Sequence, residues 1–183
     1  MTLRTPASWM QGGSHPAEND RLTLRGIVGS QGVCVGTAEL QVTQSVSPAM
    51  SVLVAAGWGW VLGTTSASQG MYNTYNDAAV TLAVTTAHAT LARIDLVCLT
   101  IRDAAYAGAF TDCILQVVAG TPSGSPVAPA LPASSLSLAT IAVGAAVSSI
   151  VNANITDTRT RAALAMAASG SAAYKAGLLL GGM

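Results

Sequence analysis

The sequence predicts an all-β fold, an antiparallel β-sandwich or small barrel, with an extended N-terminal arm and a short Ala/Gly-rich C-terminal tail. Two observations lead to this prediction. Short β-like runs alternate with turn residues from residue 26 to about residue 160, and they include almost no amphipathic helical repeat. Small and β-branched residues dominate the composition, and these favour pleated sheets. We therefore expect an arm at residues 1–25, a β-sandwich domain at 26–160 and a tail at 161–183.

The two terminal parts lack the strand pattern of the middle. No helical or strand periodicity extends over residues 1–25, so we expect them to form an extended arm. Residues 161–168 are rich in Ala and predict a short helix that Gly170 ends. Because such a short helix is marginal alone, we expect the tail to need a partner surface.

The first half of the domain contains four stretches with strand character. They cover residues 38–43, 50–55, 58–61 and 80–85. In the third stretch, Trp58 and Trp60 fall on one face of the strand, with Gly59 and Val61 on the other, because side chains alternate along a strand. We therefore expect the two tryptophans to lie side by side.

The segment RIDLVCLTIRD, residues 93–103, is apolar at both its odd and its even positions. A strand with two apolar faces is covered on both sides, so we expect it at the centre of the fold. Residues 113–118 form a similar run and predict an antiparallel hairpin with it. Residues 120–132 are rich in Pro and predict a polyproline-like strap across the domain. Strand character returns at residues 137–143 and 150–155.

The charge composition disfavours several classes of partner. The net charge is zero, so no electrostatic surplus attracts nucleic acid or an anionic membrane. Gly interrupts the most apolar segments, so we expect no membrane insertion. Charged residues make up only 9% of the chain, against roughly 25% in an average soluble protein. Surfaces with so few charges are typical of subunits in assemblies, so we expect a protein that associates with copies of itself.

No motif of the sequence supports catalysis or a cofactor. Asp95 and Asp103 lie about 26 Å apart on an extended strand, at roughly 3.3 Å per residue, which is too far for an acid/base couple. His15 and His88 do not accompany a nucleophile motif, and Cys34, Cys98 and Cys113 lack zinc-site spacing. We expect no catalytic, cofactor-binding or metal-binding residues, and hence a protein that is not an enzyme.

Four charged residues at strand ends are predicted to form structural ion pairs. Arg93 and Asp95 begin the central strand, and Asp157 and Arg159 repeat the same spacing near the end of the domain. If the two strand ends adjoin, Arg93 meets Asp157 and Asp95 meets Arg159 in charge-assisted pairs.

Four aromatic residues are candidates for a contact surface: Trp58, Trp60, Tyr72 and Tyr75. Aromatic rings beside Gly and Asn can stack on a sugar, which suits binding to a host-cell glycan. Two Trp residues at strand spacing more often pack in the core or between subunits. Both interpretations remain open at this point.

Several segments, read in order, resemble minor tail proteins of phages that infect actinobacteria, which share features with upper-baseplate and tail-fibre modules. These segments are SHPAENDRL, SVSPAMSVLVAAGWGWVLG, GMYNTYNDA, RIDLVCLTIRD, VVAGTPSGSPVAPALP and LATIAVGAAVSSIVNANITDTR. The resemblance covers residues 14–159. It implies a non-enzymatic, β-rich structural protein of the virion, assembled in the host cytoplasm and trimeric in fibre-like settings.

The resemblance is compatible with three places in the particle. The chain could connect parts of the tail tip, baseplate or fibre and dock onto other virion proteins. It could instead decorate the capsid or form a head fibre. It could also be an adhesin module that binds the host receptor. Because the tail of this chain is short, we expect a compact connector or a decorating subunit rather than a whole adhesin.

Overall fold

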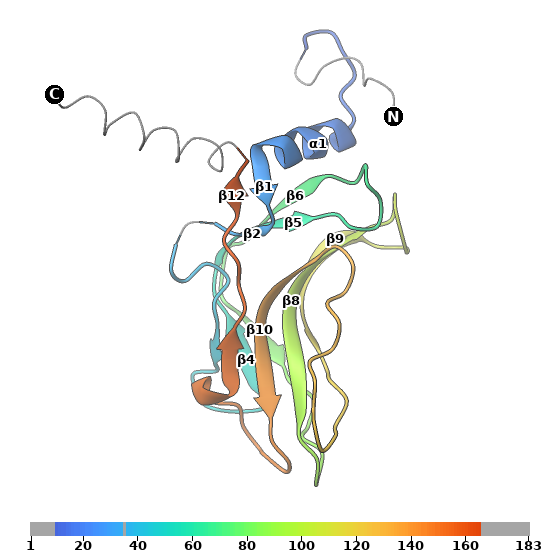
Figure 1. Ribbon diagram of the computed structural model, residues 1–183. Coiled ribbons are helices and arrows are strands. Elements are labelled where there is room, and N and C mark those ends of the chain that lie inside the picture. The colour runs from blue at the N-terminus through green and yellow to red at the C-terminus, as the bar shows by residue number, and fades with distance from the viewer. Residues whose placement is uncertain (1–9, 35, 166–183) are drawn as a thin grey trace, which may run out of the picture.

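The computed structural model describes residues 10–34 and 36–165, and its regular structure consists mostly of strands (Figure 1). One helix, α1 (Ala17–Ile27), comes first, and a 3-10 turn, η1 (Asn152–Asn154), precedes the eleventh strand. The strands are β1 (Val28–Ser30), β2 (Gly32–Val33), β3 (Val42–Gln44), β4 (Ser51–Val54), β5 (Gly57–Leu62), β6 (Met71–Asn76), β7 (Val80–Ala83), β8 (Arg93–Asp103), β9 (Thr111–Val118), β10 (Ser135–Val143), β11 (Ile155–Asp157) and β12 (Ala163–Leu164).

These strands form antiparallel sheets, which confirms the predicted all-β class. The largest sheet has the order β11-β10-β8-β9. Two three-stranded sheets have the orders β2-β5-β6 and β3-β4-β7. A short pair, β1 with β12, lies beside α1 at one end of the molecule (Figure 1).

The core contains residues of the four-stranded sheet and of both three-stranded sheets. Val97 and Ile141 from the large sheet are fully buried, and they belong to the same apolar cluster as Val52, Val54 and Val61 from the smaller sheets. Full burial of one such side chain contributes about 1.5–3 kcal/mol, so this cluster is the main stabilising contact among the sheets.

Strand β8 occupies the predicted central position. It pairs with β10 on one side and with β9 on the other, and the residues of both its faces, such as Val97 and Cys98, are buried. The hairpin of β8 with β9 is confirmed. The Pro-rich strap contains no helix or regular strand, and it follows β8 closely (Figure 1). The backbone N–H of Ser123 donates to the carbonyl of Ala92 over 2.9 Å.

The prediction of an extended arm is wrong for the residues of α1. The helix starts directly after Pro16, carries Glu18 and Asp20 in its first turn and Arg25 in its last turn. These charges suit the helix dipole. No residue of α1 is fully buried. The segment is short and mostly polar, so the apolar pattern that indicates a helix gave no signal for it.

Two other local predictions need correction. Residues 163–164 form β12 rather than part of a helix, because they pair with β1; the rest of the tail, 166–183, lies outside the described residues. Only the end of the predicted strand 38–43 is extended. Leu40 has a φ of 51° and is buried within a turn, and β3 starts at Val42.

Candidate functional site

The outer face of the β5–β6 hairpin carries an exposed aromatic pair. Trp58 lies opposite Tyr75, and their ring centroids are 4.4 Å apart with the planes tilted by 31°. Trp58 is 43% exposed and Tyr75 54% exposed. Trp60 follows on the same face, opposite Asn73, which is also exposed. The predicted placement of both tryptophans on one face is therefore confirmed.

Glycine on the inner face of β5 explains why the aromatic rings point outward. A Cβ on Gly59 would lie 3.0 Å from a methyl of Leu99 and 3.1 Å from a methyl of Leu40. Only a residue without a side chain lets β5 approach the core this closely. The large side chains of β5, Trp58 and Trp60, consequently lie on its outer face.

The two tryptophans differ in their anchoring. The indole N–H of Trp60 donates to the sulfur of Cys34 over 3.2 Å, and this side chain is only partly exposed. The ring of Trp58 is held by contact with Tyr75, while its backbone N–H donates to the carboxylate of Glu39 over 2.8 Å. Trp58 is therefore the more accessible of the two for a partner.

Tyr72 does not belong to this aromatic surface. It lies opposite Val61, so it points to the other face of the hairpin, and its hydroxyl donates to Asp103 over 2.7 Å. Burial, and to a lesser degree the hydrogen bond to Asp103, raise the pKa of Tyr72 from 10.0 to about 12. Sequence reasoning missed this contact because Asp103 lies on another sheet.

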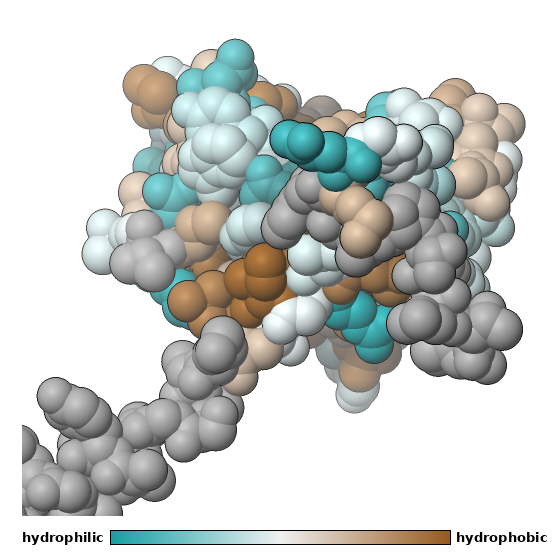
Figure 2. Space-filling view, turned by 90° about the horizontal axis from the view of Figure 1, so that it is seen from above, coloured by the Kyte–Doolittle hydropathy of each residue, from teal (hydrophilic) through white to brown (hydrophobic). Residues whose placement is uncertain are grey.

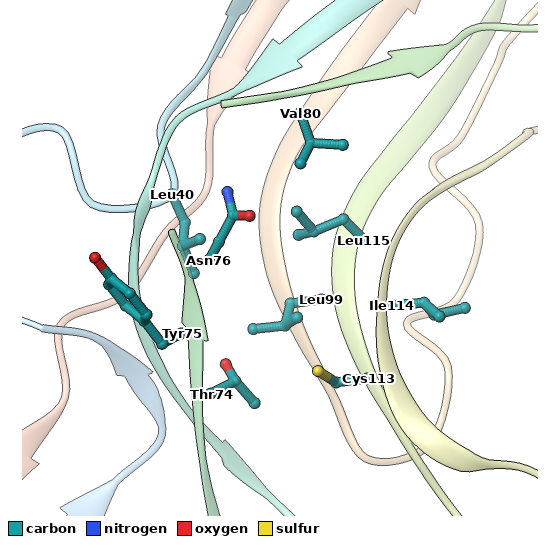
Figure 3. Close-up of a pocket in the computed structure, with 9 residues that line it drawn as sticks. All are labelled: Leu40, Thr74, Tyr75, Asn76, Val80, Leu99, Cys113, Ile114 and Leu115. Atoms are coloured by element: carbon teal, nitrogen blue, oxygen red, sulfur yellow. The ribbon is translucent and has the colours of Figure 1, made fainter. Parts of the chain in front are cut away.

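An apolar slot opens beside the aromatic pair, between β6 and β9. Its volume is about 350 Å³. Figure 3 shows Leu99 and Leu115 pointing into the space between these strands, with Val80 of β7 above them, whereas Ile114 points away. Tyr75 belongs to both the aromatic surface and the rim of the slot. This slot could not be predicted from the sequence, because the strands on its two sides belong to different sheets.

Apolar side chains are also exposed at the end of the molecule that carries α1. Ile27 is 46% exposed and Leu164 60% exposed. The view from above in Figure 2 shows brown apolar areas between white and teal ones. The described surface is thus a mixture of apolar and neutral polar groups with few charges.

All four predicted ion-pair residues form ion pairs, but the predicted partners are wrong. Arg93 pairs with Asp95, with a distance of 2.8 Å from Nε to Oδ1, and Arg159 pairs with Asp157 at 2.6 Å. Strand β10 lies between β8 and β11, which separates the two pairs by at least two strand spacings, roughly 9.6 Å. They are also offset along the strands, because Arg93 lies opposite Val143 of β10 and Asp157 opposite Ala139. Each Arg instead reaches the Asp two residues away on its own strand or segment.

Both ion pairs also hold distant backbone segments. Arg93 donates to the carbonyls of Thr85 and Thr86, and Asp95 accepts a 2.8 Å bond from the backbone N–H of Gly120. Arg159 donates to the carbonyls of Thr37 and Glu39. The Arg159 guanidinium lowers the pKa of Asp157 from its ordinary value. These charges therefore act as clamps between segments of the fold.

No family model, curated protein or solved structure matches this chain. Within residues 10–34 and 36–165, no three His, Cys, Asp or Glu side chains gather closely enough to hold a metal ion. In the same part of the chain, no helix is long and apolar enough to cross a membrane.

Proposed function

We propose that this chain is a non-enzymatic structural protein of a bacteriophage virion, a minor tail protein that connects parts of the tail tip, baseplate or fibre. It assembles with copies of itself and docks onto neighbouring virion proteins. The observation that carries this proposal is the exposed pair Trp58–Tyr75 on a surface with few charges. Aromatic residues are enriched and charged residues depleted at the centres of protein–protein interfaces.

The described arginines form hydrogen bonds within the subunit, which supports docking onto an apolar or neutral partner surface. The arginines of the described part of the chain all hydrogen-bond within it; they are Arg21, Arg25, Arg93, Arg102, Arg159 and Arg161. Side chains that already hold backbone carbonyls or carboxylates have fewer donors left for an external ligand. Contact through apolar and neutral polar groups is therefore the simplest mode of docking.

The proposed scaffold for this role is a β-sandwich built by residues 26–160. In this arrangement the sheet β11-β10-β8-β9 is one layer, and the two three-stranded sheets together form the other. The shared apolar cluster supports this assignment. We further propose a homotrimer, because the resemblance to fibre-like virion modules implies threefold symmetry.

Two alternatives place the same surface elsewhere. A capsid decoration or head-fibre protein would use it to bind the head. A receptor-binding adhesin would present it to a host glycan, and the exposed Trp58, Tyr75 and Asn73 favour this second candidate because ring faces and an amide suit a sugar.

A reconstruction of the whole particle tests these assignments through the location and symmetry of the chain. We expect copies around the tail axis, with Trp58 buried against a neighbouring subunit. Trp58→Ala should then reduce incorporation into particles, whereas Trp60→Phe, which keeps an aromatic ring at the less exposed position, should not. A location on the head would favour decoration. An outward-facing Trp58, with Trp58→Ala losing adsorption to cells rather than incorporation, would favour the adhesin. Absence of the chain from particles would contradict all three.

A further inference from the structure

The slot between β6 and β9 is bounded by two edge strands. Within the described part of the chain, β6 pairs only with β5 and β9 only with β8. Edge strands present unpaired N–H and C=O groups, and monomeric proteins usually protect them with Pro or with charged side chains such as Lys. Strand β6 contains neither a charged residue nor Pro. In β9 the one charged residue is Asp112, which is paired with Arg102.

The interior of the slot is suited to aliphatic side chains. It is lined by Leu40, Val80, Leu99 and Leu115 and has a volume of about 350 Å³. Filling it would remove this apolar lining from water, which is the main favourable term in association. An extended segment could add hydrogen bonds along either edge strand while its side chains fill the slot.

An exposed carboxylate lies next to one of the lining residues in the sequence. Asp77 follows directly after Asn76, which lines the slot, and Asp77 is exposed. Among the described residues it forms no ion pair, in contrast to Asp95, Asp112 and Asp157. Asp77 therefore offers one negative charge to a ligand whose remaining contacts are apolar.

The chain itself contains a segment with the complementary chemistry. Residues 166–183 lie outside the described part, and they include Lys175, the one lysine of the protein, followed by the apolar run Leu178, Leu179 and Leu180. Extended, the ten residues from Ala165 to Lys175 span at most about 36 Å. This length is enough to reach a neighbouring subunit.

We propose that residues 174–180 of a second copy of this chain occupy the slot, with the leucines inside it and Lys175 beside Asp77. A second copy is favoured because the described chain ends at Ala165, whose N–H bonds to the carbonyl of Ile27 at the end of α1. The slot is lined by residues 74–76, at the end of β6 away from α1. The contact is therefore head-to-tail, and such contacts give a ring when the rotation between copies closes and an open filament when it does not. The inference rests on the proposed self-assembly.

Disulfide trapping in the full-length chain tests the contact directly. Cys113 lines the slot and is exposed, so a cysteine placed at a leucine of the bound segment should come within bonding distance. Leu178→Cys, Leu179→Cys and Leu180→Cys are each oxidised with diamide and run on a non-reducing gel. We expect covalently linked chains from at least one variant, and their loss when Cys113→Ser is added. Cys34 and Cys98 remain in place as internal controls.

The proposed contact between Lys175 and Asp77 is tested by exchanging the two charges. Asp77→Lys should weaken assembly by at least about two- to fivefold in the dissociation constant, measured by light scattering, and Lys175→Asp in the same chain should restore it. A disulfide within one chain would overturn the second copy as occupant. Oligomers that form no disulfide at any of the three positions would overturn the inference but leave the proposed self-assembly intact. A monomer at all concentrations would contradict both.

Discussion

The hydroxyl of Tyr72 lies at a junction of three segments that are distant in the sequence. It donates to Asp103 at the end of β8, while the Arg21 guanidinium of α1 lies 4.9 Å from the centre of the Tyr72 ring. Arg21 also donates to the hydroxyl of Tyr106 over 2.9 Å and to the carbonyl of Gln69. Because α1 buries no residue fully, these polar and cation–π contacts make an important contribution to holding the helix on the sheets, beside its partly buried Leu22 and Leu24.

Tyr72 gives the protein a predicted sensitivity to alkaline pH. Its pKa is raised from 10.0 to about 12, so the folded state holds the phenol proton more tightly than the unfolded state does. The resulting stability is fully present below pH 10 and is lost as the pH rises through 12. Absorbance of tyrosinate at alkaline pH should show one late-titrating tyrosine that is missing in Tyr72→Phe.

The same variant should lose about 1.5–3 kcal/mol of unfolding free energy near neutral pH, because the hydrogen bond to a carboxylate is removed. Its stability should also fall less steeply than that of the natural protein at alkaline pH. If the late titration persists in Tyr72→Phe, another tyrosine is responsible and the assignment is wrong.

At the same scale, the sequence allowed the presence of ion pairs to be predicted but not their partners. Arg93 and Asp95 begin a buried strand, and buried charges need partners, so pairing was a physical necessity. The choice of partner depended on the strand order, in which β10 separates β8 from β11. The contact between Tyr72 and Asp103 was equally hidden, because it links β6 to the end of β8 in another sheet.

At the scale of elements, the strap shows how closely an irregular segment can follow a central strand. A Cβ added to Gly120 would lie 2.0 Å from the carbonyl oxygen of Ile94. The backbone N–H of the same glycine donates to the buried carboxylate of Asp95. The start of the strap is therefore fixed against β8 by contact with its backbone.

Gly120→Ala should destabilise the protein by at least about 2–3 kcal/mol, because backbone rather than a flexible side chain must move. Gly124→Ala is the matched control in the same strap, since a Cβ there would meet no atom within 4 Å. It should change the unfolding free energy by less than about 0.5 kcal/mol. Urea unfolding measures both variants, and equal midpoints would show that the strap is not held in this way.

Strands were predictable where side chains of two kinds alternate, as in β5, or where both faces of the strand are apolar, as in β8. Prediction failed where tertiary pairing decided the structure. Strand β12 is extended because it pairs with β1, although its Ala-rich sequence favours a helix. Helix α1 lies over the start of β6, and its short, mostly polar sequence did not indicate a helix.

At the scale of the whole molecule, the sheets share one apolar core and are joined by a few polar clamps. The pair of Arg93 and Asp95 is the most buried of these clamps, with exposures of 4% and 0%. Through it, β8 is connected to the carbonyls of Thr85 and Thr86 and to the start of the strap at Gly120. A substitution that breaks the Arg93–Asp95 pair should therefore lower the stability of the whole domain rather than disturb one loop.

Arg93→Met is expected to lower the unfolding free energy by about 3–5 kcal/mol, because it leaves the Asp95 carboxylate buried without a cation. The double variant Arg93→Met/Asp95→Leu removes both charges and should lose less than the single variant, although the bond to Gly120 is lost as well. Chemical denaturation at one fixed protein concentration compares the two, since self-association would otherwise shift the apparent stability. The double variant could instead be less stable than Arg93→Met. The hydrogen bond from Gly120 of the strap to Asp95 would then contribute more to stability than the neutralisation of the Asp95 charge by Arg93.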